Sequence, residues 1–181
     1  MNHFTGNLIS LSDKQLGELE YYAFPENITR KMVNDFCSKV NLLINLKHLS
    51  IAGFLTPNKY GPLLLSKIPV LTKLQGLNCS NCCLKDLSPI MCLTNLKYLF
   101  CCWNELTSLP VDIGVLCNLK TLDCYHNNLT SFPSSLYELK NLKILNVNWN
   151  KFKSFPFDIE LLKNLEQFYI HYNQFDSSFY F

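Results

Sequence analysis

A chain of 181 residues with 48% apolar side chains is long enough to bury one sizeable core, and its formal net charge of +2 is close to neutral. Because Arg30 is the only arginine, the basic field of a dedicated nucleic-acid binder is missing, and nucleic acid is not the expected partner. No apolar run approaches the roughly 20 residues that span a bilayer, so we expect no membrane contact.

The first 45 residues predict a helical N-terminal cap. The segments "SDKQLGELEYYAF" and "NITRKMVNDFCSKVNLL" both carry helical signals, and Pro25 separates them. Asn27 or Thr29 is expected to cap the second segment. Its apolar residues recur at helical spacing: Met32, Val33, Phe36, Val40 and Leu43. Such a cap would cover the edge of the first strand that follows.

A period of 23 residues dominates the rest of the chain. It reads "LKYLFCCWNELTSLPVDIGVLCN" from Leu96, "LKTLDCYHNNLTSFPSSLYELKN" from Leu119 and "LKILNVNWNKFKSFPFDIELLKN" from Leu142. A 22-residue version opens at Leu74 and a degenerate 28-residue version at Leu46. A sixth unit stops with the chain. We therefore expect a second region, residues 46–181, of about six repeats with the last one truncated.

These units resemble the leucine-rich repeat family, L-x-x-L-x-L-x-x-N-x-L, in the 23-residue form of its intracellular, Ras-binding-type group. The resemblance implies an α/β repeat solenoid shaped like a horseshoe, with a parallel β-sheet on the concave side. The cysteine-containing strands and the heavy use of asparagine and lysine resemble repeat proteins of AT-rich microbes and large DNA viruses. We expect a cytoplasmic protein, in the host cytoplasm if the source is a virus.

The same architecture follows from the alternation of side chains within one unit. In a short strand the fourth and sixth positions face one way, and the third, fifth and seventh face the other. Each turn is too small to bury its own apolar face, so neighbouring turns must stack. At the ninth position, one amide per turn can satisfy buried backbone groups where the strand ends. This structural ladder is expected to comprise Asn104, Asn127, Asn150 and Asn173 and to fade toward the N-terminus, where Cys82 and Phe54 take the position.

The cysteines invite a zinc site or a catalytic nucleophile, but the repeat explains their spacing. Nine cysteines, an odd number with two adjacent pairs, favour reduced thiols over a disulfide framework. Cys79 and Cys82 form a C-x-x-C only because they occupy the sixth and ninth positions. A catalytic triad of Cys102, Asp123 and His126 is not expected. Asp123 and His126 are three residues apart on an extended strand, about 10 Å, which exceeds hydrogen-bond reach. We expect free thiols, no metal, no cofactor and no enzyme; a cysteine-dependent enzyme using Cys102 is an alternative.

The second position carries a row of lysines, Lys47, Lys97, Lys120 and Lys143, which could attract phosphate. We interpret it as an ordinary solvated row.

The outward strand positions are the ones that the scaffold does not fix. They hold many aromatic residues in the middle and last turns and small residues in the first two. Aromatic side chains exposed on a rigid sheet are typical binding anchors. We therefore predict a non-catalytic module that binds a peptide or a small protein domain on its concave face. The partner-binding residues are expected to be Tyr98, Phe100, Trp103, Tyr125, His126, Trp149, Tyr169 and Tyr172.

Two further hypotheses concern the ends of the chain. The N-terminal helices would serve, in an alternative function, as the adaptor-binding module of a ubiquitin-ligase-type complex, although the usual Leu-Pro opening of an F-box is missing. The truncated last repeat would expose an edge strand near Phe168. We expect Phe179 and Phe181 to fold back over that edge, with weak homo-dimerisation as the alternative.

Overall fold

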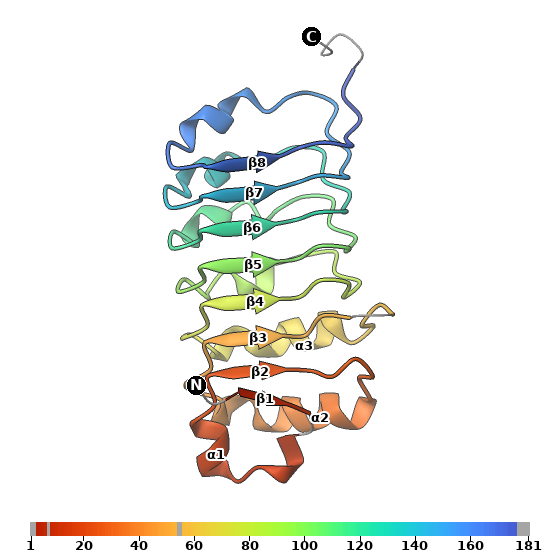
Figure 1. The fold of residues 1–181 in the computed structure, drawn as a ribbon, viewed down its shortest axis with the longest axis vertical. Helices are drawn as coiled ribbons and strands as arrows, with labels where there is room; N and C mark the ends of the chain where they lie inside the picture. The colour runs from red at the N-terminus through yellow and green to blue at the C-terminus, as the bar shows by residue number, and fades with distance from the viewer. Residues whose placement is uncertain (1–2, 7, 54–55, 177–181) are drawn as a thin grey trace.

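One parallel β-sheet runs through the part of the chain that the structure describes. The computed structural model describes residues 3–6, 8–53 and 56–176. Eight strands pair strictly in chain order, β1 to β8, as the stacked arrows of Figure 1 show. The strands are His3–Thr5 (β1), Tyr21–Ala23 (β2), His48–Ser50 (β3), Gly76–Asn78 (β4), Tyr98–Phe100 (β5), Thr121–Asp123 (β6), Ile144–Asn146 (β7) and Gln167–Tyr169 (β8).

The register of the sheet keeps equivalent repeat positions side by side. Leu99 pairs with Leu122, and Leu122 with Leu145, so the fourth positions form one buried column. Because all strands share this register, every inward position meets the same kind of apolar neighbour. The result is a single continuous core rather than one core per turn.

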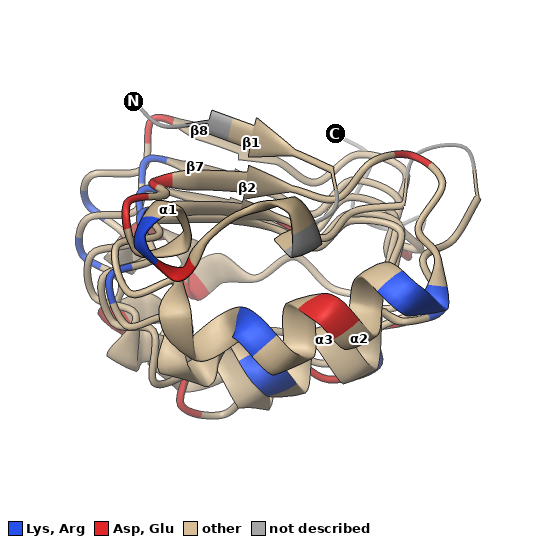
Figure 2. Cartoon of the chain, turned by 90° about the horizontal axis from the view of Figure 1, so that it is seen from below, with Lys and Arg blue, Asp and Glu red and all other residues tan. Residues whose placement is uncertain are grey.

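The return segments form a second layer on the other side of the core, with the strands above and the helices below in Figure 2. The α-helices Arg30–Lys39 (α2) and Gly61–Lys67 (α3) lie there, whereas the short α-helix Asp13–Gly17 (α1) lies between the strands and α2 in this view. Short 3-10 helices make the other returns: Leu8–Ser10, Val40–Leu42, Ile68–Val70, Ser88–Ile90, Ile113–Val115, Ser134–Glu138 and Phe157–Leu161. This confirms the predicted α/β leucine-rich repeat solenoid.

The N-terminal segment contains the expected helices, but it is not helical throughout. Thr29, not Asn27, caps α2, since its hydroxyl accepts a hydrogen bond from the Met32 amide at 3.3 Å. The stretch "EYYAF" was expected to continue a helix and instead forms β2, which pairs with β3. The physical reason is visible in the sequence, because Leu19, Tyr22 and Phe24 are buried at the spacing of the first, fourth and sixth repeat positions. The boundary between a cap and a repeat region at residue 45 stays a prediction, since the sheet runs across it without a break.

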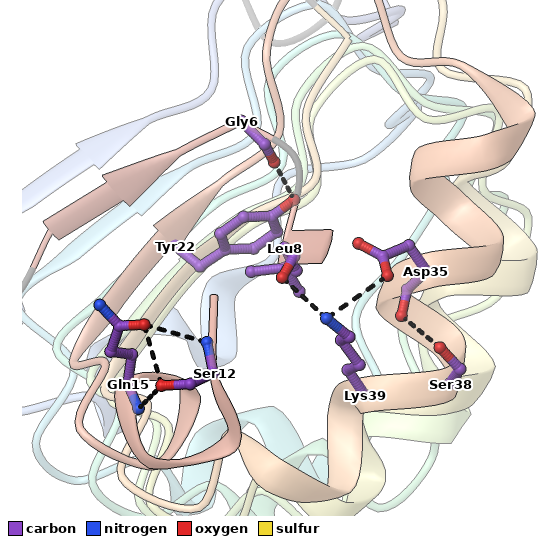
Figure 3. A network of polar contacts seen from close by, with 8 residues as sticks. All are labelled: Gly6, Leu8, Ser12, Gln15, Tyr22, Asp35, Ser38 and Lys39. Atoms are coloured by element: carbon purple, nitrogen blue, oxygen red, sulfur yellow. Dashed lines mark hydrogen bonds and ion pairs between the residues drawn. The ribbon is translucent and has the colours of Figure 1, made fainter. Parts of the chain in front are cut away.

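A polar network holds the first turn against α2 (Figure 3). The Tyr22 hydroxyl donates to the Gly6 carbonyl at 2.8 Å, and the Lys39 ammonium donates to the Leu8 carbonyl at 2.9 Å. The same ammonium lies 3.8 Å from the buried carboxylate of Asp35. Burial, with Asp35 nearby, raises the pKa of Tyr22 well above its ordinary value, so the hydroxyl keeps its proton and its hydrogen bond.

Candidate functional site

Four buried or half-buried asparagines close the bend that follows each of the last four strands. The Asn127 amide nitrogen lies 3.0 Å from the carbonyl of Cys101, one turn back, and 3.1 Å from the carbonyl of Cys124 in its own turn. Its amide oxygen accepts from the Leu106 nitrogen at 3.1 Å. The same pattern recurs around Asn104, Asn150 and Asn173. These side chains satisfy backbone groups of two adjacent turns. Their amide groups therefore have a structural role and are not available to bind a partner.

The earlier turns close the same bend with different groups. In the ninth position of the turn that begins at Leu74, the Cys82 thiol lies 3.0 Å from the Ile51 carbonyl. The same carbonyl accepts from the Asn58 amide at 2.7 Å. Asn58 is buried, and its backbone nitrogen donates to Asn81, as that of Asn127 does to Trp149. Asn58 therefore acts as a ladder residue that the sequence pattern missed, because the longer 28-residue unit displaces it from the ninth position.

A second row of asparagines, also not predicted, joins the turns at the opposite end of the strands. Each side-chain amide in this row donates to a backbone carbonyl of the preceding turn at 2.7–2.9 Å. The members are Asn45, Asn95, Asn118, Asn141 and Asn164. They precede the first leucine of a unit, so their recurrence with the repeat was the signal that could have identified them.

The sixth-position cysteines are core residues. Cys79, Cys101 and Cys124 are fully buried, and the sulfurs of the last two lie 3.3 Å apart. All nine cysteines are free thiols. Burial raises the pKa of Cys79 well above its ordinary value and that of Cys82 to about 12, so both stay protonated. Among the residues that the structure describes, no group of three or more histidine, cysteine or acidic side chains could hold a metal ion.

Cys102, Asp123 and His126 do not form a catalytic triad. Burial, followed by the charge of Asp123, raises the pKa of the Cys102 thiol, which opposes formation of the thiolate that a nucleophile needs. One carboxylate oxygen of Asp123 accepts from the Tyr125 amide at 3.1 Å. The His126 ring is stacked on Trp103 instead. This geometry supplies no activated nucleophile.

The lysine row lies where the strands begin, on the side where blue segments gather in Figure 2. Its two outer members are ion-paired at 2.6 Å, Lys47 with Glu20 and Lys143 with Glu166. Lys97 donates to the Gln75 amide oxygen at 3.1 Å. Carboxylates thus neutralise the two outer lysines of the row. The two middle lysines, Lys97 and Lys120, have no carboxylate partner among the described residues.

The eighth-position residues have an unusual backbone. Trp103, His126, Trp149 and Tyr172, together called the aromatic rim, all have φ between 53° and 57°. This left-handed region is uncommon for side chains other than glycine, asparagine and aspartate. One turn earlier, Asn81 occupies the same position with φ 53°. The bend therefore requires a left-handed residue, for which asparagine suffices.

The aromatic rim forms one stack past the ends of the strands. The rings of Trp103 and His126 stack with centroids 3.7 Å apart, those of His126 and Trp149 are 6.2 Å apart, and those of Trp149 and Tyr172 are 4.6 Å apart. Despite this stacking, 51% of Trp103, 47% of Trp149 and 69% of Tyr172 remains exposed. The stack is therefore a solvent-facing apolar surface.

The other predicted partner residues do not all join this surface. Tyr125 contacts the rim, with its ring centroid 5.6 Å from that of Trp103. Tyr98 and Phe100 are exposed on β5, and Tyr169 on β8. Since β6 and β7 separate these two strands, the predicted strip is divided into the rim with Tyr125, a pair on β5 and a single tyrosine on β8.

An eight-stranded parallel solenoid with leucine columns and asparagine-closed bends defines a repeat scaffold of leucine-rich turns. Within the described part of the chain, no helix has the length and apolar character needed to cross a membrane. A family model described as a leucine-rich repeat region matches residues 47–179. The chain belongs to the leucine-rich repeat family. Repeat domains of this family are generally protein-binding scaffolds and typically non-catalytic.

Solved structures share the fold. A leucine-rich repeat protein of Leptospira interrogans is 27% identical over 91% of this chain, with a TM-score of 0.67. Two internalins of Listeria monocytogenes, F and C2, are 20% and 21% identical over 90% and 86% of the chain, with TM-scores of 0.64 and 0.66. The chain spans only 46%, 51% and 64% of these three proteins. A comparison with curated proteins gives no match.

Proposed function

We propose that this protein is a non-catalytic interaction module that binds a peptide or small domain of a partner protein across the exposed face of the sheet and the aromatic rim. The observation that carries the proposal is the left-handed backbone of the rim. A bulky residue in that region costs about 1–2 kcal/mol relative to its preferred conformation. Asn81 meets the same requirement of the bend at a lower cost.

Stacking offsets part of this cost, at about 0.5–1.5 kcal/mol for a ring pair. It does not explain why a stack should be built where asparagine would serve and where half of each tryptophan stays in water. Exposed tryptophan and tyrosine on a rigid frame are the residue types that concentrate binding energy in protein interfaces. A recognition role for the rim accounts for both observations.

The test separates binding from folding by substituting the residue that the bend prefers. Trp149→Asn should leave the free energy of unfolding within about 1 kcal/mol of wild type, because relief of the backbone offsets the lost stacking. Binding to the native partner, captured by proximity labelling and then purified, should weaken by about 2 kcal/mol or more, roughly thirtyfold. Val111→Asn is the matched control, since Val111 is 85% exposed and lies outside the sheet. Equal binding by the wild type and Trp149→Asn would contradict the proposal.

Finer features of the proposal rest on separate support. Consecutive 23-residue steps support assignment to the intracellular, Ras-binding-type group of repeats, and nine free thiols support a cytoplasmic location. A weak homo-dimer through β8 is supported by the exposed Gln167 and Tyr169 on that edge. Phe179 and Phe181, expected to cover the edge, lie outside the described residues. Light scattering over a micromolar concentration series tests the dimer.

A further inference from the structure

A hollow of about 370 Å³ lies on the exposed face of the sheet over β2 to β5, apart from the aromatic rim. Tyr21 on β2 stands at one side, and Tyr98 and Phe100 on β5 stand at the other. Three strand spacings of about 4.8 Å separate these sides, or about 14 Å. His48 and Ser50 on β3 and Gly76 and Asn78 on β4 lie between them, and Ala23 accompanies Tyr21 on β2. This volume is at the lower end of the range of ligand pockets, about 300–1,000 Å³.

Gly76 makes room for the side chain of His48. A Cβ atom at this position would lie 2.5 Å from the Nδ1 atom of His48, so the imidazole of His48 lies against the glycine. The first atoms that such a Cβ meets belong to this exposed-face side chain and not to the core. A glycine inside a strand weakens it and marks a close approach of another group. The glycine at position 76 therefore lowers the stability of β4. It allows the imidazole of His48 to line the hollow between Tyr21 and Tyr98.

The charge beside the hollow is positive and uncompensated. Its lining contains no aspartate or glutamate. Lys97 immediately precedes Tyr98, and Lys120 holds the equivalent place one turn later. Unlike Lys47 and Lys143, these two lysines have no carboxylate partner within the described ranges. A carboxylate supplied by a bound partner would complete the row as Glu20 and Glu166 do at its ends.

We propose that the hollow receives an aromatic side chain from an extended segment of the partner protein, and that an acidic residue next to that side chain pairs with Lys97 and Lys120. The inference rests on the proposed function and specifies the chemistry of the partner. Tyrosine, phenylalanine and imidazole rings favour an aromatic occupant over an aliphatic one, because ring pairs gain about 0.5–1.5 kcal/mol beyond the area that they bury. With only two lysines that have no carboxylate partner here and a single arginine in the chain, a peptide is favoured over a nucleic acid.

The experiment uses two defined dipeptides and needs no identified partner. N-acetyl-Asp-Trp-amide and N-acetyl-Lys-Trp-amide are titrated into the isotope-labelled protein, and the backbone amide shifts of Ser50 and Gly76 and the ring shifts of His48 are followed by NMR. We expect both probes to perturb these signals, with the acidic probe binding several-fold more tightly at low salt and losing this advantage at high salt. Shifts confined to other parts of the molecule, or tighter binding of the basic probe, would overturn the inference. So would tighter binding of adenosine monophosphate than of the acidic dipeptide.

Matched variants fill the hollow or leave it open. Gly76→Tyr places a tyrosine at the third repeat position, which Tyr98 holds on β5, and its Cβ atom would displace the His48 side chain. It should weaken binding of the acidic dipeptide about tenfold. Thr121→Tyr makes the corresponding change at the same repeat position on β6, outside the hollow, and should bind the dipeptide like wild type. Equal affinity of both variants would overturn the inference.

The native partner distinguishes failure of this inference from failure of the proposed function. Loss of partner binding in Trp149→Asn and in Gly76→Tyr, but not in Thr121→Tyr, supports both. Loss of partner binding in Trp149→Asn alone contradicts the inference about the hollow and supports the aromatic rim as the binding site. Wild-type binding by all three variants contradicts both proposals.

Discussion

The turns after Leu96 and the turns before it build the same strand with different residues around it. In the later turns an asparagine closes each bend and an aromatic residue holds each left-handed position. In the earlier turns Cys82 and Asn58 close the bends, and Asn81 holds the left-handed position. Both halves keep the same strand register and the same buried fourth position.

This difference separates what the scaffold needs from what it merely accepts. Because the fold forms with a thiol at the ninth position and an asparagine at the eighth, the rim aromatics of the later turns are not a folding requirement. The early turns likewise show that the third position needs no large side chain, since Gly76 occupies it on β4. The outer surface therefore varies independently of the core, and the features that cost stability without serving the core are the candidates for function.

The largest expected effect tests the early half. A Cβ atom at Gly61, the first residue of α3, would lie 2.3 Å from the carbonyl oxygen of Cys82. Gly61→Ala should destabilise by about 3 kcal/mol or more, although alanine favours helices, because rigid backbone and not a flexible side chain blocks the space. Denaturant unfolding measures the change. Gly17→Ala is the control, since its nearest atom is 3.8 Å away, and similar losses in both variants would contradict the close packing of α3 on Cys82.

The next effect tests the later half. Asn127→Ala should destabilise by about 1–3 kcal/mol, because it leaves the buried Leu106 amide without its partner. It also removes one of the two asparagine hydrogen bonds to each of the Cys101 and Cys124 carbonyls, which keep those from Asn104 and Asn150. Asn118→Ala, in the exposed second row, should cost less than about 1 kcal/mol. A change within about 0.5 kcal/mol for Asn127→Ala would mean that the ladder is dispensable in both halves.

A pH effect should be concentrated in the turns that begin at Leu74 and Leu96, which hold four thiols with raised pKa values: Cys79, Cys82, Cys101 and Cys102. Burial is the leading cause for all of these except Cys101, whose hydrogen bond with Cys124 comes first. Because the folded-state pKa is raised, the stabilisation is fully present below the unfolded value of 9.0 and is lost as the pH rises above it. Each thiol should contribute a fall of up to about 1.4 kcal/mol per pH unit.

Unfolding at pH 7 and pH 10 measures this loss. The double variant Cys82→Ala with Cys102→Ala should show a smaller decrease in the free energy of unfolding between these two pH values than wild type. A decrease of the same size in both proteins would place its origin in other groups.

The smallest expected effect exchanges a feature between the halves. Asn81→Trp introduces a rim aromatic into the turn that begins at Leu74, and the variant loses the hydrogen bond from the Asn81 side-chain amide to the Gly53 carbonyl at 3.3 Å. Left-handed strain should exceed the new stacking on Trp103, for a net loss of about 0.5–1 kcal/mol. Thermal unfolding of this variant and of Trp149→Asn tests both directions. A clear gain of stability in Asn81→Trp would show that stacking alone explains the rim.

The sequence by itself determined the repeat, the parallel sheet, the inward cysteines and the positions of the ladder asparagines. These features depend on contacts that recur with the period, so each appears several times along the chain. It also contained the strand at Tyr22, but aromatic residues in place of leucine and helical signals on both sides of it concealed the pattern.

Only the tertiary structure decided which outward residues form one surface. The rim stack depends on the left-handed backbone at the eighth position, which redirects Trp103 and Trp149 past the strand ends, whereas Tyr98 and Tyr169 stay on strands three positions apart in the sheet. The hollow depends on the packing of His48 against Gly76 from a neighbouring turn. Asn58 acts as a ladder residue although the longer 28-residue unit displaces it from the ninth position. The rim stack, the hollow and the ladder role of Asn58 all depend on contacts between turns. These contacts lie where the repeat is irregular or where its pattern does not fix the residue, so the periodic pattern alone cannot specify them.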